Sequence, residues 1–219
     1  MPGVGVAVQY RPSTTVAGDF YDFICVDQTR LGILIADVLG HGIGASLIAS
    51  MLKVAFNAEA AHAADPGAVL KGVNDALVGL LSRDRDYVTA CYLVVDPDSG
   101  QLIYANGGHP PPLLIDADGI VRSLDEGGTI LGQFATASYS SIALPVAPGS
   151  RLLLYTDGVT EVMNRAGEMF GVDRVKELMR THQHQDANTC AELVLEAVAD
   201  WRGGHAFDDD VTVLVIDIG

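Results

Sequence analysis

Acidic residues gather at four places along the chain, and each place borders a short apolar run that is typical of a β-strand. They are Asp19 with Asp22, then Asp37, then Asp157, and last the run Asp208, Asp209 and Asp210. Carboxylates brought together without bases repel one another, so they either take up protons or hold a cation. Oxygen ligands alone suit hard divalent ions such as Mg²⁺ and Mn²⁺. The pattern therefore predicts one divalent metal site assembled at strand ends.

Three of these acids share a local arrangement. Asp37 ends the apolar run GILIAD and enters VLGHGIGAS, where glycines let the backbone approach a ligand before a helix begins. Asp157 follows RLLLYTD in the same way, and Asp209 precedes the strand VTVLVID. One such aspartate alone would more often cap a turn or a helix. Three strands that each present an acid at one end favour a shared site, although we expect at least one acid of 208–210 to lie only in a solvated loop.

The order of expected strands and helices indicates an α+β architecture. Periodicity predicts strands at 4–10, 20–26, 31–37, 87–95, 101–105, 110–115, 120–124, 140–144, 151–155 and 211–218. It predicts helices at 43–63, 66–81, 172–182 and 189–201. The strands at 140–144 and 151–155 are expected to be neighbours joined by a turn. Strands grouped in this way favour two sheets sandwiched by helices over a doubly wound sheet.

The first helix should bury one apolar stripe, made of Ile43, Leu47, Ile48, Met51, Leu52 and Ala55. Asp65 is expected to cap the second helix at its N-terminus, with Pro66 in the first turn.

Composition limits the class of protein and its partners. The 219 residues are 49% hydrophobic, which predicts a single domain over 1–219 with one sizeable core. The formal charge of −15 repels phosphate backbones and anionic membranes, so neither nucleic acid nor a membrane is an expected partner. Cys25, Cys91 and Cys190 show neither disulfide nor metal-ligand spacing, and the N-terminus lacks the pattern of a secretory signal. A reducing cytoplasm is the expected location.

A set of motifs in fixed order then resembles a known family. The motifs are AGDFYD (17–22), DVLGHGIGAS (37–46), YVTACY (87–92), YANGGHPPP (104–112), LLLYTDGVTE around Asp157, FG (170–171) and DDVT (209–212). Together they resemble the metal-dependent protein phosphatases (PPM), and specifically their bacterial SpoIIE/RsbU-type branch. The resemblance covers nearly the whole chain.

This resemblance implies a four-layer α-β-β-α sandwich of two antiparallel sheets flanked by helices, with two Mn²⁺ or Mg²⁺ ions. It implies that Asp37 bridges both metals, that the backbone carbonyl of Val38 binds the first, and that Asp157 and Asp209 bind the second. Asp19 matches a position that holds water in the outer shell. A water shared by two cations loses proton affinity and can attack phosphoserine or phosphothreonine directly, so no covalent phosphoenzyme is required.

Other positions are weaker expectations. Asp22 is a lesser candidate of the same kind as Asp19, and Gly158 and Asp210 are expected to support the ligands. Gly107-Gly108-His109 stands where eukaryotic relatives carry Gly-Asp-Ser, which favours two metals over three.

Four residues are candidates for binding substrate, and each has a structural explanation that competes. Arg11 could lie on an exposed strand edge, and His41 could fix the glycine-rich turn. Asn106 and His109 could form a polar turn between strands. In eukaryotic relatives Gly-His follows the aspartate at once, whereas here Val38-Leu39-Gly40 separate Asp37 from His41. A general-acid role therefore cannot simply be carried over to His41.

The resemblance also implies a partner. In this branch the substrate is typically a small phosphorylated STAS-domain regulator of the anti-anti-sigma type. The chain begins almost at its first strand, so a preceding sensor region is expected to be absent or separate. A homodimer through the helices after Asp37 is expected, and these helices are expected to carry regulation. The alternatives are a catalytically weak phosphatase-like module that binds a partner, and a two-metal phosphohydrolase that acts on nucleotides.

Overall fold

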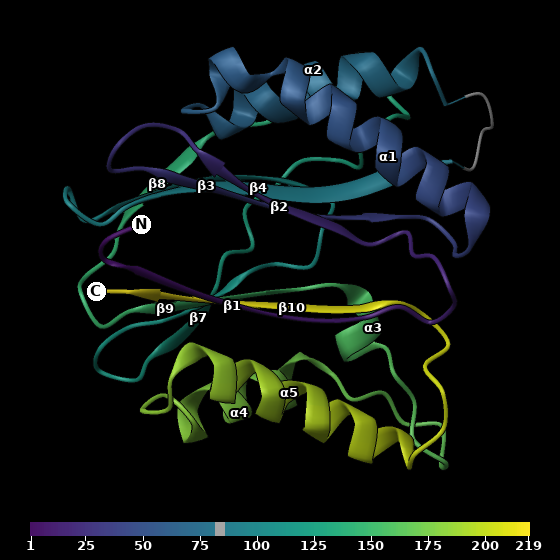
Figure 1. Cartoon of the computed structure of the whole chain (residues 1–219), viewed down its shortest axis with the longest axis vertical. Coiled ribbons are helices and arrows are strands. Elements are labelled where there is room, and N and C mark those ends of the chain that lie inside the picture. Colours follow the sequence, from purple (N-terminus) through teal and green to yellow (C-terminus); the bar gives the residue numbers. More distant parts are fainter. Residues whose placement is uncertain (82–85) are drawn as a thin grey trace. The chain divides into compact units, whose positions relative to one another are not determined.

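The computed structural model describes residues 1–81 and 86–219, and the chain falls into two compact units. Unit 1 comprises residues 1–15, 110–125 and 146–219, and unit 2 comprises residues 16–109 and 126–145. Each unit contains one five-stranded sheet with helices packed on it (Figure 1).

Unit 2 is built on an antiparallel sheet with the strand order β2-β3-β4-β5-β8. The strands are β2 (Phe20–Cys25), β3 (Leu31–Val38), β4 (Val88–Asp96), β5 (Gln101–Gly107) and β8 (Ile142–Pro145). The helices are α1 (Ile43–Ala58), the 3₁₀ turn η1 (Ala60–His62) and α2 (Pro66–Val78). Asp65 caps α2 as expected, because its carboxylate accepts a hydrogen bond from the Ala68 N–H at 3.3 Å.

The core of unit 2 lies between this sheet and its helices. Leu34, Ala36 and Val38 of β3 pack in one cluster with Leu52 of α1 and Leu70 of α2. Successive residues of a strand point to opposite faces of the sheet. Asp37 therefore lies on the face that α1 and α2 do not cover.

The expected helix at 43–63 ends earlier than its sequence predicts. α1 stops at Ala58, and hydrogen bonds from His62 N–H to Glu59 O and from Ala63 N–H to Ala60 O form the tighter 3₁₀ turn. The hydroxyl of Tyr92 donates to the Ala63 carbonyl at 2.8 Å, so a tertiary contact holds the chain in this turn.

The buried face of α1 also differs from the prediction. Leu52 and Ala55 are buried as expected, and so are Ala45 and Ala49, whereas Ile43 is 74% exposed and Leu47 is 61% exposed. Small side chains allow a helix to approach a sheet closely, and the alanine stripe therefore packs inward. The expected buried positions Ile43 and Leu47 were wrong, and these residues form an exposed apolar surface instead.

Unit 1 contains the second antiparallel sheet, with the order β1-β10-β9-β6-β7. The strands are β1 (Val4–Arg11), β6 (Leu113–Ile115), β7 (Val121–Ser123), β9 (Arg151–Tyr155) and β10 (Val211–Ile218). The helices are α3 (Asp157–Thr160), α4 (Val172–Thr181) and α5 (Ala187–Arg202). The short helix α3 was not expected from the sequence.

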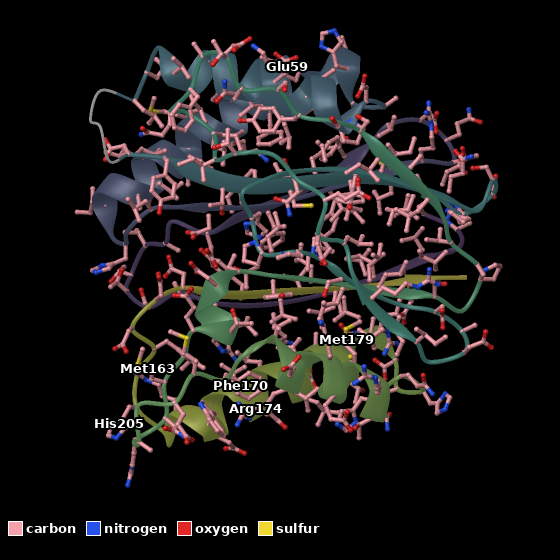
Figure 2. All side chains as sticks on the ribbon, turned by 180° about the vertical axis from the view of Figure 1, so that it is seen from behind. Glu59, Met163, Phe170, Arg174, Met179 and His205 are labelled. Atoms are coloured by element: carbon pink, nitrogen blue, oxygen red, sulfur yellow. The ribbon has the colours of Figure 1, made fainter. Side chains whose placement is uncertain are left out.

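The C-terminal end of α5 is fixed by aromatic packing. The guanidinium carbon of Arg174 lies 4.0 Å from the centroid of the Trp201 ring, and the Phe170 ring lies 5.9 Å from it, edge to face. Figure 2 shows Phe170 and Arg174 together below the sheet of unit 1. Gly203 then ends the helix with a φ of 75°, a left-handed conformation that glycine adopts at little cost.

The strands at 140–144 and 151–155 are not neighbours, so this expectation was wrong. β8 pairs with β5 in unit 2, whereas β9 pairs with β10 and β6 in unit 1. The chain passes from one unit to the other between Pro145 and Val146. Proline lacks the N–H that a hairpin ladder would need, so Pro145 and Pro148 favour a connection between sheets over a tight hairpin.

The α+β class is confirmed, as are the two antiparallel sheets and their flanking helices. Each unit supplies one sheet and one helix layer. The single domain over 1–219 stays a prediction. In the part of the chain that the structure describes, none of the helices has the length and apolar character needed to span a membrane.

Candidate active site

Asp37 lies near the end of β3 and is half-buried. It is paired with Thr89 of β4, and the register of β2 against β3 pairs Phe20 with Ala36. Asp19 directly precedes Phe20, and Asp37 directly follows Ala36, so both acids follow the last pair at this end of the ladder. Asp19 is buried, at 6% exposure. Two of the expected carboxylates therefore lie at the same end of the sheet in unit 2.

Gly18 makes this arrangement possible. A Cβ atom at Gly18 would lie 2.9 Å from the carbonyl oxygen of Val38 and 3.0 Å from that of Gly40. Only a residue without a side chain lets the two segments approach so closely. The backbone next to Asp19 is thus in contact with the backbone next to Asp37, including the carbonyl that was expected to bind metal.

In unit 1, Asp157 is the first residue of α3, directly after β9. Thr156, the residue before Asp157, is hydrogen-bonded to β10, because its N–H donates to the Thr212 carbonyl at 3.1 Å. The Thr212 N–H donates in return to Thr156 Oγ1 at 3.1 Å. A Cβ atom at Gly158 would lie 2.0 Å from the carbonyl oxygen of Asp210. Asp157 is therefore held against the start of β10.

The three acids before β10 have different surroundings. Asp210 is buried, and its Oδ1 accepts hydrogen bonds from the Ser13 N–H at 2.7 Å and the Ser13 hydroxyl at 3.0 Å. The Asp210 N–H donates to Asp209 Oδ1 at 2.8 Å, while Asp209 itself is exposed. Asp208 is 81% exposed and forms an ion pair with Arg202. Asp210 thus anchors the loop, and Asp209 is left at the surface beside Asp157.

The electrostatics of this unit fit a cation. Burial raises the pKa of the Asp157 carboxyl above its ordinary value, and the charges of Asp209 and Glu161 raise it further. A divalent ion would relieve this repulsion, and oxygen donors suit Mg²⁺ and Mn²⁺. Across residues 1–81 and 86–219, no group of three or more aspartate, glutamate, histidine or cysteine side chains is arranged so that it could hold a metal ion. Each unit carries part of the acidic set.

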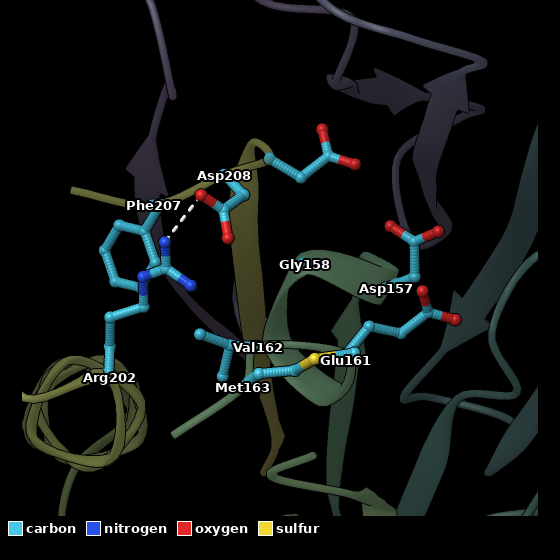
Figure 3. Close-up of a pocket in the computed structure, with 9 residues that line it drawn as sticks. Asp157, Gly158, Glu161, Val162, Met163, Arg202, Phe207 and Asp208 are labelled. Carbon is cyan, nitrogen blue, oxygen red and sulfur yellow. Dashed lines mark hydrogen bonds and ion pairs between the residues drawn. The ribbon is translucent and has the colours of Figure 1, made fainter. Parts of the chain in front are cut away.

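A pocket of about 220 Å³ lies beside Asp157 and Asp209 in unit 1 (Figure 3). Glu161 and Asp208 add further carboxylates, and Val162 with other apolar side chains lines the rest. Arg202, the last residue of α5, also lines the pocket. Sequence reasoning missed Arg202, because only the fold brings the end of α5 to the strand ends.

The remaining expected residues have varied positions. Asp22 binds Lys53 of α1, with 2.9 Å between Oδ2 and Nζ, so it lies on the helix-covered face and not with Asp37. Arg11 ends β1 and is exposed, and His41 is exposed in the turn before α1.

Asn106, near the end of β5, and His109 form a buried turn. The Asn106 amide donates to the His109 carbonyl at 2.9 Å, and the His109 N–H donates to Asn106 Oδ1 at 2.8 Å. Through these hydrogen bonds Asn106 stabilises the polar turn that was expected as its structural role. The ring Nδ1 of His109 lies 2.9 Å from the hydroxyl of Thr89, which is the ladder partner of Asp37.

Comparison with known families gives a match over most of the chain. A sequence model of the family described as Stage II sporulation protein E (SpoIIE) matches residues 27–219. The chain belongs to the SpoIIE family. The expected resemblance to the SpoIIE/RsbU branch of the metal-dependent protein phosphatases is thereby confirmed.

Individual proteins agree with membership of the SpoIIE family. The chain is 31% identical over 212 residues to the phosphoserine phosphatase RsbP of Bacillus subtilis (strain 168), covering 95% of this chain and 51% of RsbP. It therefore spans about half the length of that relative. Among solved structures, the SiaA-PP2C domain of Pseudomonas aeruginosa has a TM-score of 0.88 and 27% identity, covering 98% of this chain and 86% of that domain.

A more distant structure shares the fold. The catalytic domain of the serine threonine protein phosphatase PstP, in complex with two manganese ions, has a TM-score of 0.71 and 17% identity. The match covers 98% of each chain. The PP2C fold is therefore common to this SpoIIE-family chain and to a phosphatase whose structure contains manganese.

Proposed function

We propose that this chain is a metal-dependent protein serine/threonine phosphatase. The observation that carries the proposal is the placement of Asp37, Asp157 and Asp209 at the ends of buried strands in a SpoIIE-family chain. The relative RsbP is a phosphoserine phosphatase, which supports the same reaction here.

In this proposal Asp37, the Val38 carbonyl, Asp157 and Asp209 would together hold two divalent ions. Asp19, which directly precedes the Phe20–Ala36 pair, would orient water in the outer shell. Bound Mn²⁺ or Mg²⁺ would supply the positive charge that lowers the pKa of water and neutralises charge on the phosphoryl group. The raised pKa of Asp157 supports a cation at this position.

The protein's own groups would hold this geometry. Ser13 and Asp210 fix the loop that carries Asp209, and Thr156 fixes the start of α3. Preorganised groups of this kind need little rearrangement during the reaction, which is a large part of catalytic stabilisation. Arg11, His41, Asn106 and His109 remain proposed contacts for the substrate, and the contact of His109 with Thr89, the partner of Asp37, supports His109.

The proposed substrate is a phosphorylated STAS-domain regulator of the anti-anti-sigma type in the cytoplasm. The resemblance to the SpoIIE/RsbU branch supports this substrate, and the charge of −15 disfavours nucleic acid. We expect Mn²⁺-dependent release of phosphate from a phosphorylated STAS protein, and no release with a chelator.

Two alternatives are separated by one comparison of substrates. Turnover of a phosphoserine protein, a phosphodiester and a nucleotide would be measured with Mn²⁺ and with chelator. The proposal predicts that the phosphoserine protein is hydrolysed fastest. Preferred hydrolysis of the nucleotide would favour the two-metal nucleotide hydrolase, and binding of the phosphoprotein without turnover would favour the catalytically weak binding module.

A homodimer through α1 is also proposed. Ile43, Leu47 and Val54 are 74%, 61% and 69% exposed, and their spacing places them along one side of the helix. Exposed apolar surface of this kind is typical of an interaction site, and movement of α1 would shift the turn after Asp37. Light scattering would test this proposal, because Leu47→Glu should convert a dimer to a monomer. A wild-type monomer at all concentrations would contradict it.

A further inference from the structure

Arg202 is the only cationic residue among the described residues that line the pocket beside Asp157 and Asp209. Its side chain is 15% exposed, although it comes from the last residue of a helix. An arginine that loses this much hydration needs anionic or carbonyl partners. Its position in an acidic pocket therefore calls for a functional explanation.

Two contacts hold the guanidinium group. Arg202 Nε donates to the Ala206 carbonyl at 2.9 Å, and Nη2 donates to Asp208 Oδ1 at 2.5 Å. The first contact is to backbone within the loop that follows α5. It keeps the guanidinium oriented toward the pocket whichever carboxylate Nη2 binds.

The second contact is easily exchanged. Asp208 is 81% exposed, so water competes for its carboxylate and weakens its ion pair with Arg202. Another carboxylate can therefore replace Asp208 at little cost. In the free protein, Asp208 occupies the place that an incoming carboxylate would take.

The position of Arg202 identifies which part of a substrate it would meet. Figure 3 shows Arg202 on the opposite side of the pocket from Asp157, with Val162 and Met163 between them. A phosphoserine whose phosphate lies at Asp157 and Asp209 would present a neighbouring residue to Arg202, and not the phosphate itself.

We propose that Arg202 binds an acidic side chain next to the phosphoserine of the protein substrate and so determines sequence specificity. The ion pair with Asp208 is replaced when substrate binds. This inference rests on the proposed phosphatase function. The charge of −15 would otherwise repel an acidic segment, so a preference for acidic residues requires a local cation such as Arg202.

Two phosphoserine peptides test this role, one with glutamates flanking the phosphoserine and one with glutamines at the same positions. Binding would be measured by fluorescence anisotropy with Mg²⁺ and non-hydrolysable phosphonate analogues of both peptides, and KM and kcat would be measured with the phosphopeptides and Mn²⁺. We expect wild-type protein to favour the glutamate peptide by roughly tenfold in Kd and KM, since charge-assisted bidentate hydrogen bonds are strong. Arg202→Gln should reduce this ratio to about one, and Arg202→Lys should restore it in part.

Two further variants sharpen the test. Asp208→Asn removes the competing carboxylate and should tighten binding of the glutamate peptide several-fold. Arg180→Gln makes the same change of charge on the exposed surface of α4 and should leave the ratio unaltered. Thermal unfolding of each variant would report whether it folds.

The outcomes separate this inference from the proposed function. Equal binding of both peptides to the wild type would overturn the role of Arg202. An equal loss of affinity for both peptides in Arg202→Gln would overturn it as well. A preference that depends on Arg202 without turnover of either peptide would support the role of Arg202 and contradict the proposed phosphatase activity.

Discussion

A Cβ atom at Gly158 would lie 2.0 Å from the carbonyl oxygen of Asp210. This approach brings the residue after Asp157 against the residue after Asp209, so two expected metal ligands depend on one glycine. The contact is to backbone, which cannot turn aside as a flexible side chain could.

Gly158→Ala should therefore destabilise the protein by about 1–3 kcal/mol, the usual cost of overpacking, and reduce Mn²⁺-dependent turnover at least about tenfold. Urea unfolding and phosphatase assays would measure both effects. Gly44→Ala is the matched control, because a Cβ atom there meets nothing within 4 Å. Wild-type stability and turnover in Gly158→Ala would contradict the importance of this contact.

Asp157→Asn should stabilise the metal-free protein while it abolishes turnover. Burial and the neighbouring Asp209 and Glu161 raise the pKa of Asp157, so its charged form opposes folding at neutral pH. The amide removes this penalty, and the melting temperature in chelator should rise by roughly 2 °C. Asp98→Asn, in an exposed turn, should change it little. A melting temperature for Asp157→Asn below that of the wild type in chelator would contradict the proposed repulsion between Asp157 and its acidic neighbours.

The cap of α2 should contribute to acid sensitivity. The Ser141 hydroxyl and then backbone N–H groups of α2 lower the pKa of Asp65. A lowered folded pKa gives stability that is present above the ordinary pKa of aspartate and is lost as the pH falls through the folded value. Asp65→Asn keeps a capping oxygen without this titration, so its melting temperature should fall less than that of the wild type between pH 5 and pH 3. Parallel curves for the two proteins would argue against this prediction.

Arg151 should be essential for the stability of unit 1. Its buried guanidinium binds Asp217 and donates to the carbonyls of His182 at 3.2 Å and Gln185 at 2.6 Å. Removing one partner of a buried ion pair typically costs about 3–5 kcal/mol. Arg151→Met should lose roughly this much in urea unfolding. Arg122→Met removes an exposed pair with Asp116 and should lose less than about 1 kcal/mol. Similar losses in both variants would show that burial of Arg151 is not decisive.

The strands that carry the acids could be predicted because their signal is local. Apolar, β-branched runs end at Asp37 and Asp157 and begin after Asp210, and the structure places β3, β9 and β10 there. The hairpin between β2 and β3 was likewise evident from the polar turn at 27–30. The register that brings Asp19 to the same end of the ladder as Asp37 follows from this hairpin.

Tertiary contacts decided what the sequence could not predict. Periodicity assigned the large side chains Ile43 and Leu47 to the core, but the sheet accepts the smaller Ala45 and Ala49. The bond from Tyr92 to the Ala63 carbonyl comes from a distant strand, and no local pattern reports it. Arg202 was missed for the same reason, since its neighbours in sequence show no link to Asp157.

Titration calorimetry with Mn²⁺ tests the central claim, that Asp37, Asp157 and Asp209 hold the same divalent ions. We predict two ions per wild-type chain, and a loss of affinity of at least about a hundredfold for Asp37→Asn and for Asp209→Asn. Asp22→Asn is the control, because Asp22 binds Lys53 on the helix-covered face, and it should bind Mn²⁺ as the wild type does. Unchanged Mn²⁺ binding in Asp37→Asn would contradict the proposed metal centre.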